Sequence, residues 1–311
     1  MKLSIVICTH NRSASLIKTL TSLYDDNYLG LPHVEILVVA NNCSDDTIGK
    51  LIDFNAKHPH EILKLNWLKE FKPGKSNALN TAIKKTSAEL LCFIDDDQIV
   101  ESGFLKNLLK GLKDYPDNDI YCGQLTPAWD GSEPFWVHTK GKYSVPIRPY
   151  PEFDLGETSI TLTEKHKIPS GGNITVRRMV FEKIGNFSVE LGPTGHNMIG
   201  GEDHEFISRA IQAGHTIRYL PEVKQLHAID NIRTKTLYTL KKSFYRSRSS
   251  YLVKQTDTKY SIPLFMFRKI LYFSTLSIFS LKQEHRFYYL VRLFSSLGEL
   301  SGALHNIIHQ K

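Results

Sequence analysis

The chain has 311 residues, of which 41% are hydrophobic and 23% are charged, a balance that excludes an intrinsically disordered protein. The net charge of +7 is uneven, because residues 1–230 contain 25 Lys and Arg against 29 Asp and Glu, whereas residues 231–311 contain 14 against 3. The length suits one large α/β domain with an appendage or two modest domains, and we expect the basic C-terminal region to meet an anionic surface.

Short apolar runs alternate with helical spacings over the first 120 residues. The sequence predicts strands at 3–8, 34–39, 62–68 and 90–94, and helices at 13–24, 46–57, 76–86 and 102–114. Strands that alternate with helices form a parallel sheet through right-handed crossovers. Residues 126–167 are rich in Pro, Gly and aromatic residues and are expected to be mostly loop, before a helix at 203–213 and a strand at 216–220.

The cysteines and the N-terminus indicate the compartment. Cys8, Cys43, Cys92 and Cys122 are widely spaced and contain no CxxC pair, which is typical of reduced thiols. The chain enters a strand directly after Met1-Lys2, so we expect no signal peptide. A cytoplasmic location follows.

Three aspartates, Asp95, Asp96 and Asp97, follow the apolar run at 90–94. Crowded carboxylates raise the cost of ionising one another, and a divalent cation removes that repulsion. Mg²⁺ and Mn²⁺ favour oxygen ligands and often hold substrate phosphates, and ligands of α/β sheets bind at the carboxyl ends of strands. The triplet predicts a metal-assisted phosphate site, with a solvated acidic turn as the alternative.

A second acidic pair, Glu202-Asp203, follows two glycines at the start of a predicted helix. The helix dipole stabilises an anion there, so that a carboxylate can accept a proton from an attacking hydroxyl. Simple capping of the helix by either residue is the alternative. The Gly171-Gly172-Asn173 segment is either a flexible loop that meets a ligand or a tight turn.

Eight stretches, in order over about 225 residues, resemble the family 2 glycosyltransferases of the GT-A fold. They are SIVICTHNR (4–12), EILVVANNCSDDT (35–47), KPGKSNALN (72–80), FIDDD (93–97), GGN (171–173), FEKIGNFSVELGPTG (181–195), GGEDHEFISRAIQAG (200–214) and YLPEVKQLH (219–227). The resemblance implies a catalytic domain at 1–230, with a nucleotide-binding half at 1–120 and an acceptor-binding half at 121–230. The region at 231–311 is then a mostly helical extension.

The same resemblance implies roles for the acidic residues. The family's DxD motif assigns Asp97 to a Mn²⁺ or Mg²⁺ ion braced by Asp95, and it assigns Asp95 or Asp96 to the ribose. His227 is implied as a third ligand of the metal or the diphosphate, although a lone histidine is often structural. The ED motif makes Asp203 the catalytic base and Glu202 a supporting acceptor.

Further residues are implied as contacts of the nucleotide sugar. They are Thr9, His10, Asn11, Arg12, Asn41, Lys75, Gly172 and Asn173. Ala40 stands where many relatives have an Asp that binds the nucleobase, and the Asn41 amide oxygen can substitute for it without a charge. UDP is the first choice of nucleotide, and GDP and dTDP remain open.

The C-terminal region has its own pattern. Residues 233–254 read as a basic amphipathic helix suited to an anionic membrane surface, or as a helical cap with a solvated basic face. The apolar run at 262–281 contains Arg268-Lys269, which argues against a spanning helix and favours helices that lie in a membrane interface or pack in a core. No nucleic-acid motif is present. Trp129, Phe135 and Trp136 are either core residues or a stacking platform for an acceptor sugar.

The sequence thus predicts a cytoplasmic, metal-dependent, inverting glycosyltransferase of the hexosyltransferase type, peripheral on the inner face of the cell membrane. Its acceptor is expected to be a glycan or lipid-linked hydroxyl in surface polysaccharide synthesis. The alternatives are a sugar nucleotidyltransferase, which would need a Gly-rich phosphate loop after the first strand, and a non-catalytic glycan- or membrane-binding protein.

Overall fold

The structure is a computed structural model that describes residues 2–26, 28, 30–146, 150–163, 165–190, 201–254 and 262–309. It contains two compact units. The first comprises Met1–Ala128 and Pro151–Ala228, and the second comprises Trp129–Tyr150 and Ile229–Lys311. The parts of the motif stretches at 191–195 and at residue 200 lie outside the described residues.

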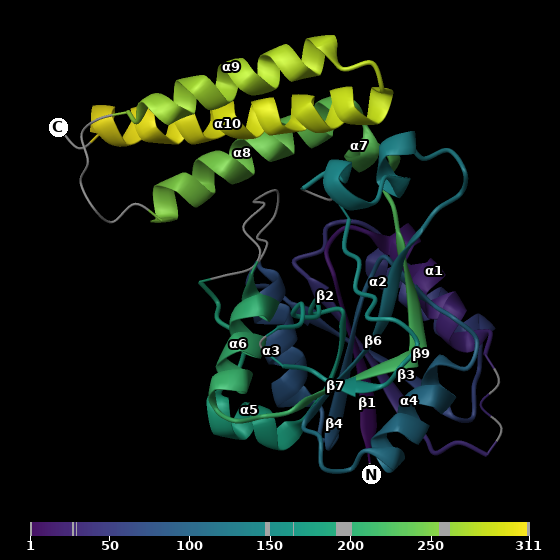
Figure 1. The fold of residues 1–311 in the computed structure, drawn as a ribbon. Coiled ribbons are helices and arrows are strands. Elements are labelled where there is room, and N and C mark those ends of the chain that lie inside the picture. Colours follow the sequence, from purple (N-terminus) through teal and green to yellow (C-terminus); the bar gives the residue numbers. More distant parts are fainter. Residues whose placement is uncertain are drawn as a thin grey trace. The chain divides into compact units, whose positions relative to one another are not determined.

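The first unit is built on one nine-stranded sheet in the order β3-β2-β1-β4-β8-β6-β9-β5, with β7 paired to β9 (Figure 1). The strands are β1 (Leu3–Thr9), β2 (Val34–Asn41), β3 (Leu63–Glu70), β4 (Leu90–Asp95), β5 (Gln98–Val100), β6 (Ile120–Ala128), β7 (Ile160–Thr161), β8 (Asn173–Arg177) and β9 (Ile217–Ala228).

The helices of this unit cover both faces of the sheet. They are α1 (Ser13–Tyr24), α2 (Thr47–Lys57), α3 (Lys75–Lys85), α4 (Phe104–Asp114), α5 (Arg178–Ile184) and α6 (Glu202–Gln212). One apolar core joins the sheet to α1, α2 and α4, and the other joins it to α3, α5 and α6. Ile5 and Ile7 of β1 point into the first core and Val6 into the second, which explains why this strand is apolar throughout.

The first four strands along the sheet, β3-β2-β1-β4, are all parallel, and the α/β prediction is confirmed. Beyond β4 the sheet is mixed, because β8 runs antiparallel to both β4 and β6. The predicted strand at 216–220 is longer in the structure, since β9 passes Pro221 through an irregularity in its pairing with β6 and continues to Ala228. This extension carries His227 to a position opposite Gln98 of β5.

The second unit is helical. It contains two 3₁₀ turns, Phe135–His138 and Gly141–Tyr143, followed by α7 (Asn231–Thr234), α8 (Thr236–Lys254), α9 (Leu264–Phe279) and α10 (Gln283–His309). The long helix α10 packs against both α8 and α9.

Residues between β6 and β7 contribute to the core of this second unit, although the sequence grouped them with 121–230. Trp136 is buried and stacks on Phe287 of α10, and Trp129 packs edge-on against Tyr150. The structure thus favours the core interpretation for Trp136 over a sugar platform. Phe135 is partly exposed and contacts the same Phe287 ring.

Candidate active site

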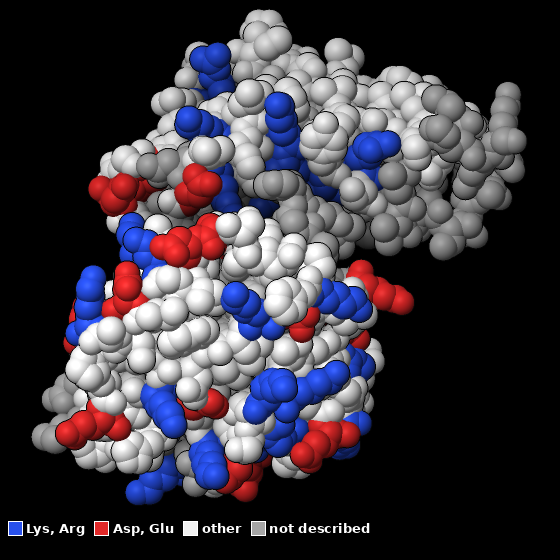
Figure 2. All heavy atoms as spheres, turned by 180° about the vertical axis from the view of Figure 1, so that it is seen from behind, with Lys and Arg blue, Asp and Glu red and all other residues white. Residues whose placement is uncertain are grey.

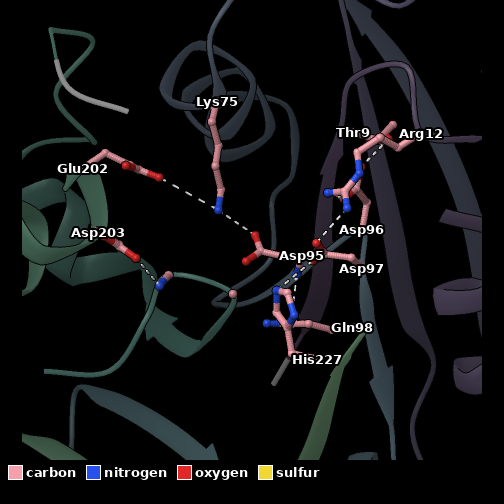
Figure 3. Close-up of polar contacts among 12 residues, drawn as sticks. Thr9, Arg12, Lys75, Asp95, Asp96, Asp97, Gln98, Glu202, Asp203 and His227 are labelled. Carbon is pink, nitrogen blue, oxygen red and sulfur yellow. Dashed lines mark hydrogen bonds and ion pairs between the residues drawn. The ribbon is translucent and has the colours of Figure 1, made fainter. Parts of the chain in front are cut away.

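The acidic triplet lies at the carboxyl end of β4, next to the end of β1 (Figure 3). Asp96 is buried and accepts hydrogen bonds from the Thr9 hydroxyl at 2.6 Å and from Arg12 Nη1 at 2.7 Å. Arg12 Nη2 lies 2.8 Å from Asp97 Oδ2, and the other oxygen of Asp97 lies 3.3 Å from His227 Nε2. One guanidinium therefore holds two carboxylates, and the solvated-turn alternative does not fit this geometry.

Burial dominates the electrostatics of Asp96. It raises the pKa of Asp96 to about 6, because lost hydration outweighs the opposing effects of the Arg12 charge and the Thr9 hydroxyl. Neighbouring Asp97 and Asp95 add to this rise. The Asp96 carboxyl is thus harder to ionise than an exposed one, and a cation bound nearby would favour its charged form.

Lys75, at the start of α3, connects the triplet to the second acidic pair (Figure 3). Its Nζ donates to Asp95 Oδ1 at 2.6 Å and lies 3.9 Å from Glu202 Oε1. Burial acts to raise the pKa of Asp95, but the Lys75 ammonium outweighs it and holds that pKa below its ordinary value. Burial raises the pKa of Glu202, against the same ammonium charge.

Asp203 lies in the first turn of α6 and is oriented by backbone donors. Its Oδ2 accepts a hydrogen bond from the Gly171 N–H at 2.7 Å, and its Oδ1 accepts one from the N–H of His204 at 2.8 Å. Glu202 is buried, and its Oε2 accepts from the N–H of Gly201. Asp203 therefore reaches toward the glycine loop, while Glu202 faces Lys75.

The two glycines before β8 fit closely between the carboxylates. A Cβ atom on Gly172 would lie 2.4 Å from Asp95 Oδ2 and 2.7 Å from Gln98 Nε2, and one on Gly171 would lie 2.9 Å from the Cβ of Asp203. Only glycine allows the loop to approach both acidic residues. The loop thus links the two acidic groups by direct contact.

We expect alanine at these two positions to separate two effects. Gly172→Ala should displace Asp95 and weaken nucleotide affinity, whereas Gly171→Ala should displace Asp203 and lower turnover, each at a stability cost of about 1–3 kcal/mol. Isothermal titration with UDP and steady-state kinetics on both variants check this. Equal effects of the two variants on affinity and on kcat would contradict the assignment.

Asn173 was predicted to contact the donor, but the structure gives its side chain a different role. Asn173 is buried, its Oδ1 accepts from the N–H of Gly123 at 3.0 Å, and its Nδ2 donates to the carbonyl of the same residue at 2.7 Å. Both polar atoms of the amide are thus used inside the sheet. The side chain joins β8 to β6.

Asn173→Ala should therefore lower stability without changing nucleotide affinity. Leaving the buried N–H and carbonyl of Gly123 unpaired is expected to cost about 1–3 kcal/mol in the free energy of unfolding. Urea denaturation measures that cost, with the exposed Asn55→Ala of α2 as the control. A loss of UDP affinity at unchanged stability would restore the donor role.

The loops after β1 and β2 form one network. Asn11, with φ of 52°, accepts hydrogen bonds at its Oδ1 from the N–H groups of Ser44 and Asp45. His10 Nδ1 lies 2.7 Å from the Asn41 carbonyl. The Asn41 side chain donates to the carbonyl of Lys72 and accepts from the N–H of Gly74.

The Asn41 amide therefore fixes the loop that carries Lys75, a positioning role that the sequence did not indicate. His10 and Asn11 tie the β1 loop to the β2 loop in the same way. From the same loop, Thr9 and Arg12 instead form hydrogen bonds with the acidic triplet (Figure 3).

Two glutamines complete the site and were not predicted. Gln98 Oε1 accepts from the backbone N–H of Asp95 at 3.1 Å and from Gln225 Nε2 at 3.0 Å. Gln225 also lies 3.2 Å from the Gly172 carbonyl. Both are buried, and the adjacency of Gln98 to the triplet was the only sequence signal available.

The donor set for a metal is partly assembled. Among the described residues, no three His, Cys, Asp or Glu side chains converge as a complete metal site. Asp97 and His227 do lie together, and the second nitrogen of His227 is buried with no hydrogen-bond partner in the described part of the chain. Carboxylate and imidazole suit Mn²⁺, which also accepts phosphate oxygens. Asp95, the third predicted ligand, faces Lys75 instead.

Asp203 lines one cavity, and a second cavity shares part of the lining of the first. One, of about 190 Å³, is lined by Pro151, Glu152, Phe153, Ile168, Pro169, Ser170, Asp203 and His204. A second, of about 440 Å³, shares Ile168, Pro169 and His204 with it and continues along the side of α6. The Asp203 carboxylate thus lies in the wall of the first cavity, which has both polar and apolar lining residues.

Comparison with known proteins agrees with this arrangement. Residues 4–185 match the family described as Glycosyl transferase family 2. The GalNAc(5)-diNAcBac-PP-undecaprenol beta-1,3-glucosyltransferase of Campylobacter jejuni is 31% identical over 109 residues, which are 35% of this chain and 34% of that protein. The match thus spans about a third of that relative. The succinoglycan biosynthesis protein ExoM of Rhizobium meliloti is 23% identical over a region that covers 78% of this chain and 72% of that protein.

Solved structures show the same fold. The mannosyltransferase PcManGT of Pyrobaculum calidifontis, in complex with GDP-Man and Mn²⁺, superposes with a TM-score of 0.60 at 16% identity, over 100% of this chain and 88% of that one. A fragment of TarS from S. aureus superposes with a TM-score of 0.54 at 14% identity, over 100% of this chain and 92% of its own. The expected GT-A architecture with C-terminal helices is confirmed.

Proposed function

The chain belongs to glycosyl transferase family 2, whose relatives include proteins of polysaccharide biosynthesis, and we propose that it is an inverting enzyme that moves a sugar from a UDP-sugar to a hydroxyl of a glycan or lipid-linked acceptor. The observation that carries this proposal is the link between two acidic centres. Lys75 and the glycine loop connect the Asp95–Asp97 cluster to Asp203, so a donor and an acceptor can meet between them.

The donor is proposed to bind over the triplet. Arg12 is half-exposed and ion-paired with Asp96 and Asp97, so its guanidinium can turn from these carboxylates toward a diphosphate. Lys75 supplies a second cation near the same place. UDP is preferred because TarS has been solved with UDP and with UDP-GlcNAc, while the GDP-Man complex of PcManGT keeps GDP open.

The transfer is a single displacement. The acceptor hydroxyl loses its proton to the Asp203 carboxylate, its oxygen forms a bond to the anomeric carbon, and the bond from that carbon to the diphosphate oxygen breaks. The electron pair leaves with UDP, and the configuration at the anomeric carbon inverts. Gly171 orients the base throughout, and Glu202 holds Lys75 beside the donor.

A Mn²⁺ or Mg²⁺ ion is proposed as cofactor, held by Asp97 and His227. When bound, such an ion neutralises charge on the leaving diphosphate. This chain's own contribution is to present one carboxylate oxygen and one imidazole nitrogen 3.3 Å apart and to hold Asp97 through Arg12 until the donor arrives.

The acceptor is proposed to enter through the cavity that Asp203 lines and the second cavity that shares part of its lining. Their lining combines the imidazoles of His166 and His204 and the ammonium of Lys167 with the apolar side chains of Ile168 and Ile207. Such a lining suits a sugar attached to a phosphate-bearing or lipid carrier. We propose that the enzyme acts in the cytoplasm at the inner face of the membrane.

Product analysis tests the proposal against its rivals. Wild-type protein incubated with UDP-sugars, Mn²⁺ and an acceptor extract should release free UDP and form a new glycoside. Pyrophosphate in place of UDP would indicate nucleotidyl transfer. Binding of UDP without turnover of any UDP-, GDP- or dTDP-sugar would favour a non-catalytic protein.

A further inference from the structure

Helix α9 exposes an unusual number of large apolar side chains. Leu264, Leu271, Ile278 and Phe279 are each between 67% and 80% exposed, and Leu281 after the helix is fully exposed. Phe265, Phe267 and Tyr272 are also exposed by about half. No other helix in the described part of the chain carries as many.

The helix has two apolar sides and only one is covered. Met266 and Phe273 are buried where α9 packs against α10, and Phe273 also lies under the Arg292 guanidinium. At 100° per residue, Leu264, Leu271 and Ile278 fall on the opposite side. A helix that is apolar on all sides requires a second apolar environment.

The charged residues around this face indicate which kind of apolar environment it contacts. Arg268 is exposed on α9, and Lys282, Glu284 and Arg286 are exposed in the segment that follows it. Residues 231–311 carry 14 Lys and Arg against 3 Asp and Glu. On the face of the molecule that Figure 2 shows, Lys and Arg side chains lie among many uncharged ones, and Asp and Glu side chains are also present. Positive charge beside an apolar strip matches the headgroup region of an anionic bilayer.

We propose that the exposed face of α9, defined by Leu264, Phe267, Leu271, Ile278 and Phe279, lies in the interface of an anionic lipid bilayer. Within the described residues, no helix is both long and apolar enough to cross a membrane. Arg268 lies within this face at headgroup depth with its apolar stem against the lipid. The helix therefore lies along the surface.

This assignment moves the membrane contact away from the basic segment at 233–254. Helix α8 packs along α10, and Leu240 and Ser243 are buried there. Among the α8 side chains that the structure describes, the exposed large apolar ones are Leu237 and Tyr245, two isolated positions in comparison with the strip on α9. Its basic residues then add long-range attraction to the bilayer, and α9 supplies the inserted surface.

The test is co-sedimentation of the full chain with vesicles of phosphatidylcholine containing phosphatidylglycerol, compared with phosphatidylcholine alone. Wild type should sediment with the anionic vesicles, and Leu271→Glu with Ile278→Glu should reduce that binding by ~10-fold or more. Both side chains are exposed, so the double variant should fold as wild type, which circular dichroism verifies. Ile52→Glu, on the exposed side of α2, is the matched control and should bind as wild type.

Three results would overturn the proposal. They are wild-type protein that stays in the supernatant, a double variant that sediments as well as wild type, and a wild-type dimer by light scattering that the double variant abolishes. The last would show that a second copy of this chain covers the face. UDP release with a soluble acceptor should be unchanged in the double variant, so failure of the membrane proposal is distinguishable from failure of the catalytic one.

Discussion

Replacing Asp203 by asparagine should lower kcat by about 10²–10⁴-fold, the usual contribution of a positioned general base. The amide oxygen can still accept the hydrogen bond from Gly171, whereas the NH2 group loses the bond from the N–H of His204, at a cost of about 1–3 kcal/mol in stability that urea denaturation measures. The amide cannot accept the proton of the acceptor hydroxyl. Affinity for the UDP-sugar should therefore be unchanged, because the donor contacts lie on the other side of Lys75.

Glu205→Gln is the matched control for this experiment. It makes the same chemical change in the same helical turn, but Glu205 faces Arg209 of its own helix at 2.7 Å. Its kcat should equal that of wild type, with at most a small loss of stability. An Asp203→Asn variant with full turnover would remove Asp203 from the base role.

Asp97→Asn should strongly weaken metal-dependent nucleotide binding. The substitution removes the anionic oxygen that lies beside His227 and leaves Arg12 with one carboxylate partner fewer. We expect UDP affinity in the presence of Mn²⁺ to fall by ~100-fold, or about 3 kcal/mol, as for the loss of a charged ligand. Calorimetric titration of UDP into each protein, with and without Mn²⁺, measures the UDP affinity under both conditions.

Asp53→Asn, on the exposed side of α2, controls for the change in net charge. Its UDP affinity should match that of wild type under both conditions. If UDP binds wild type equally well in the presence of a chelator and in the presence of Mn²⁺, the proposal that Asp97 holds a metal is wrong. This conclusion holds even if Asp97→Asn binds UDP weakly.

The sequence predicted the first half of the fold closely because its signals are local. Buried parallel strands such as β1 and β4 are continuous apolar runs, and α1 places Leu16, Leu20 and Leu23 on one buried face. The second half depends on pairings between distant strands. Strands β6 and β8 were not predicted, and the extension of β9 past Pro221 was missed because proline usually ends a strand.

In the candidate site, too, local signals were readable from the sequence and contacts between distant residues were not. Motifs located the acidic residues and Lys75, but they could not show which partner each one faces. The direction of the Asn173 amide, for example, depends on Gly123, 50 residues away. The orientation of Asp95 toward Lys75 likewise depends on the start of α3, which only the folded sheet brings alongside β4.

The most direct measurement of the central claim is a crystal structure of the protein with UDP and Mn²⁺. We expect the ion against Asp97 and His227, the diphosphate beside Arg12 and Lys75, and an open path from the β-phosphate to Asp203. Density for UDP and Mn²⁺ at any other place on the protein, with the Asp95–Asp97 cluster still closed by Arg12 and Lys75, would contradict it.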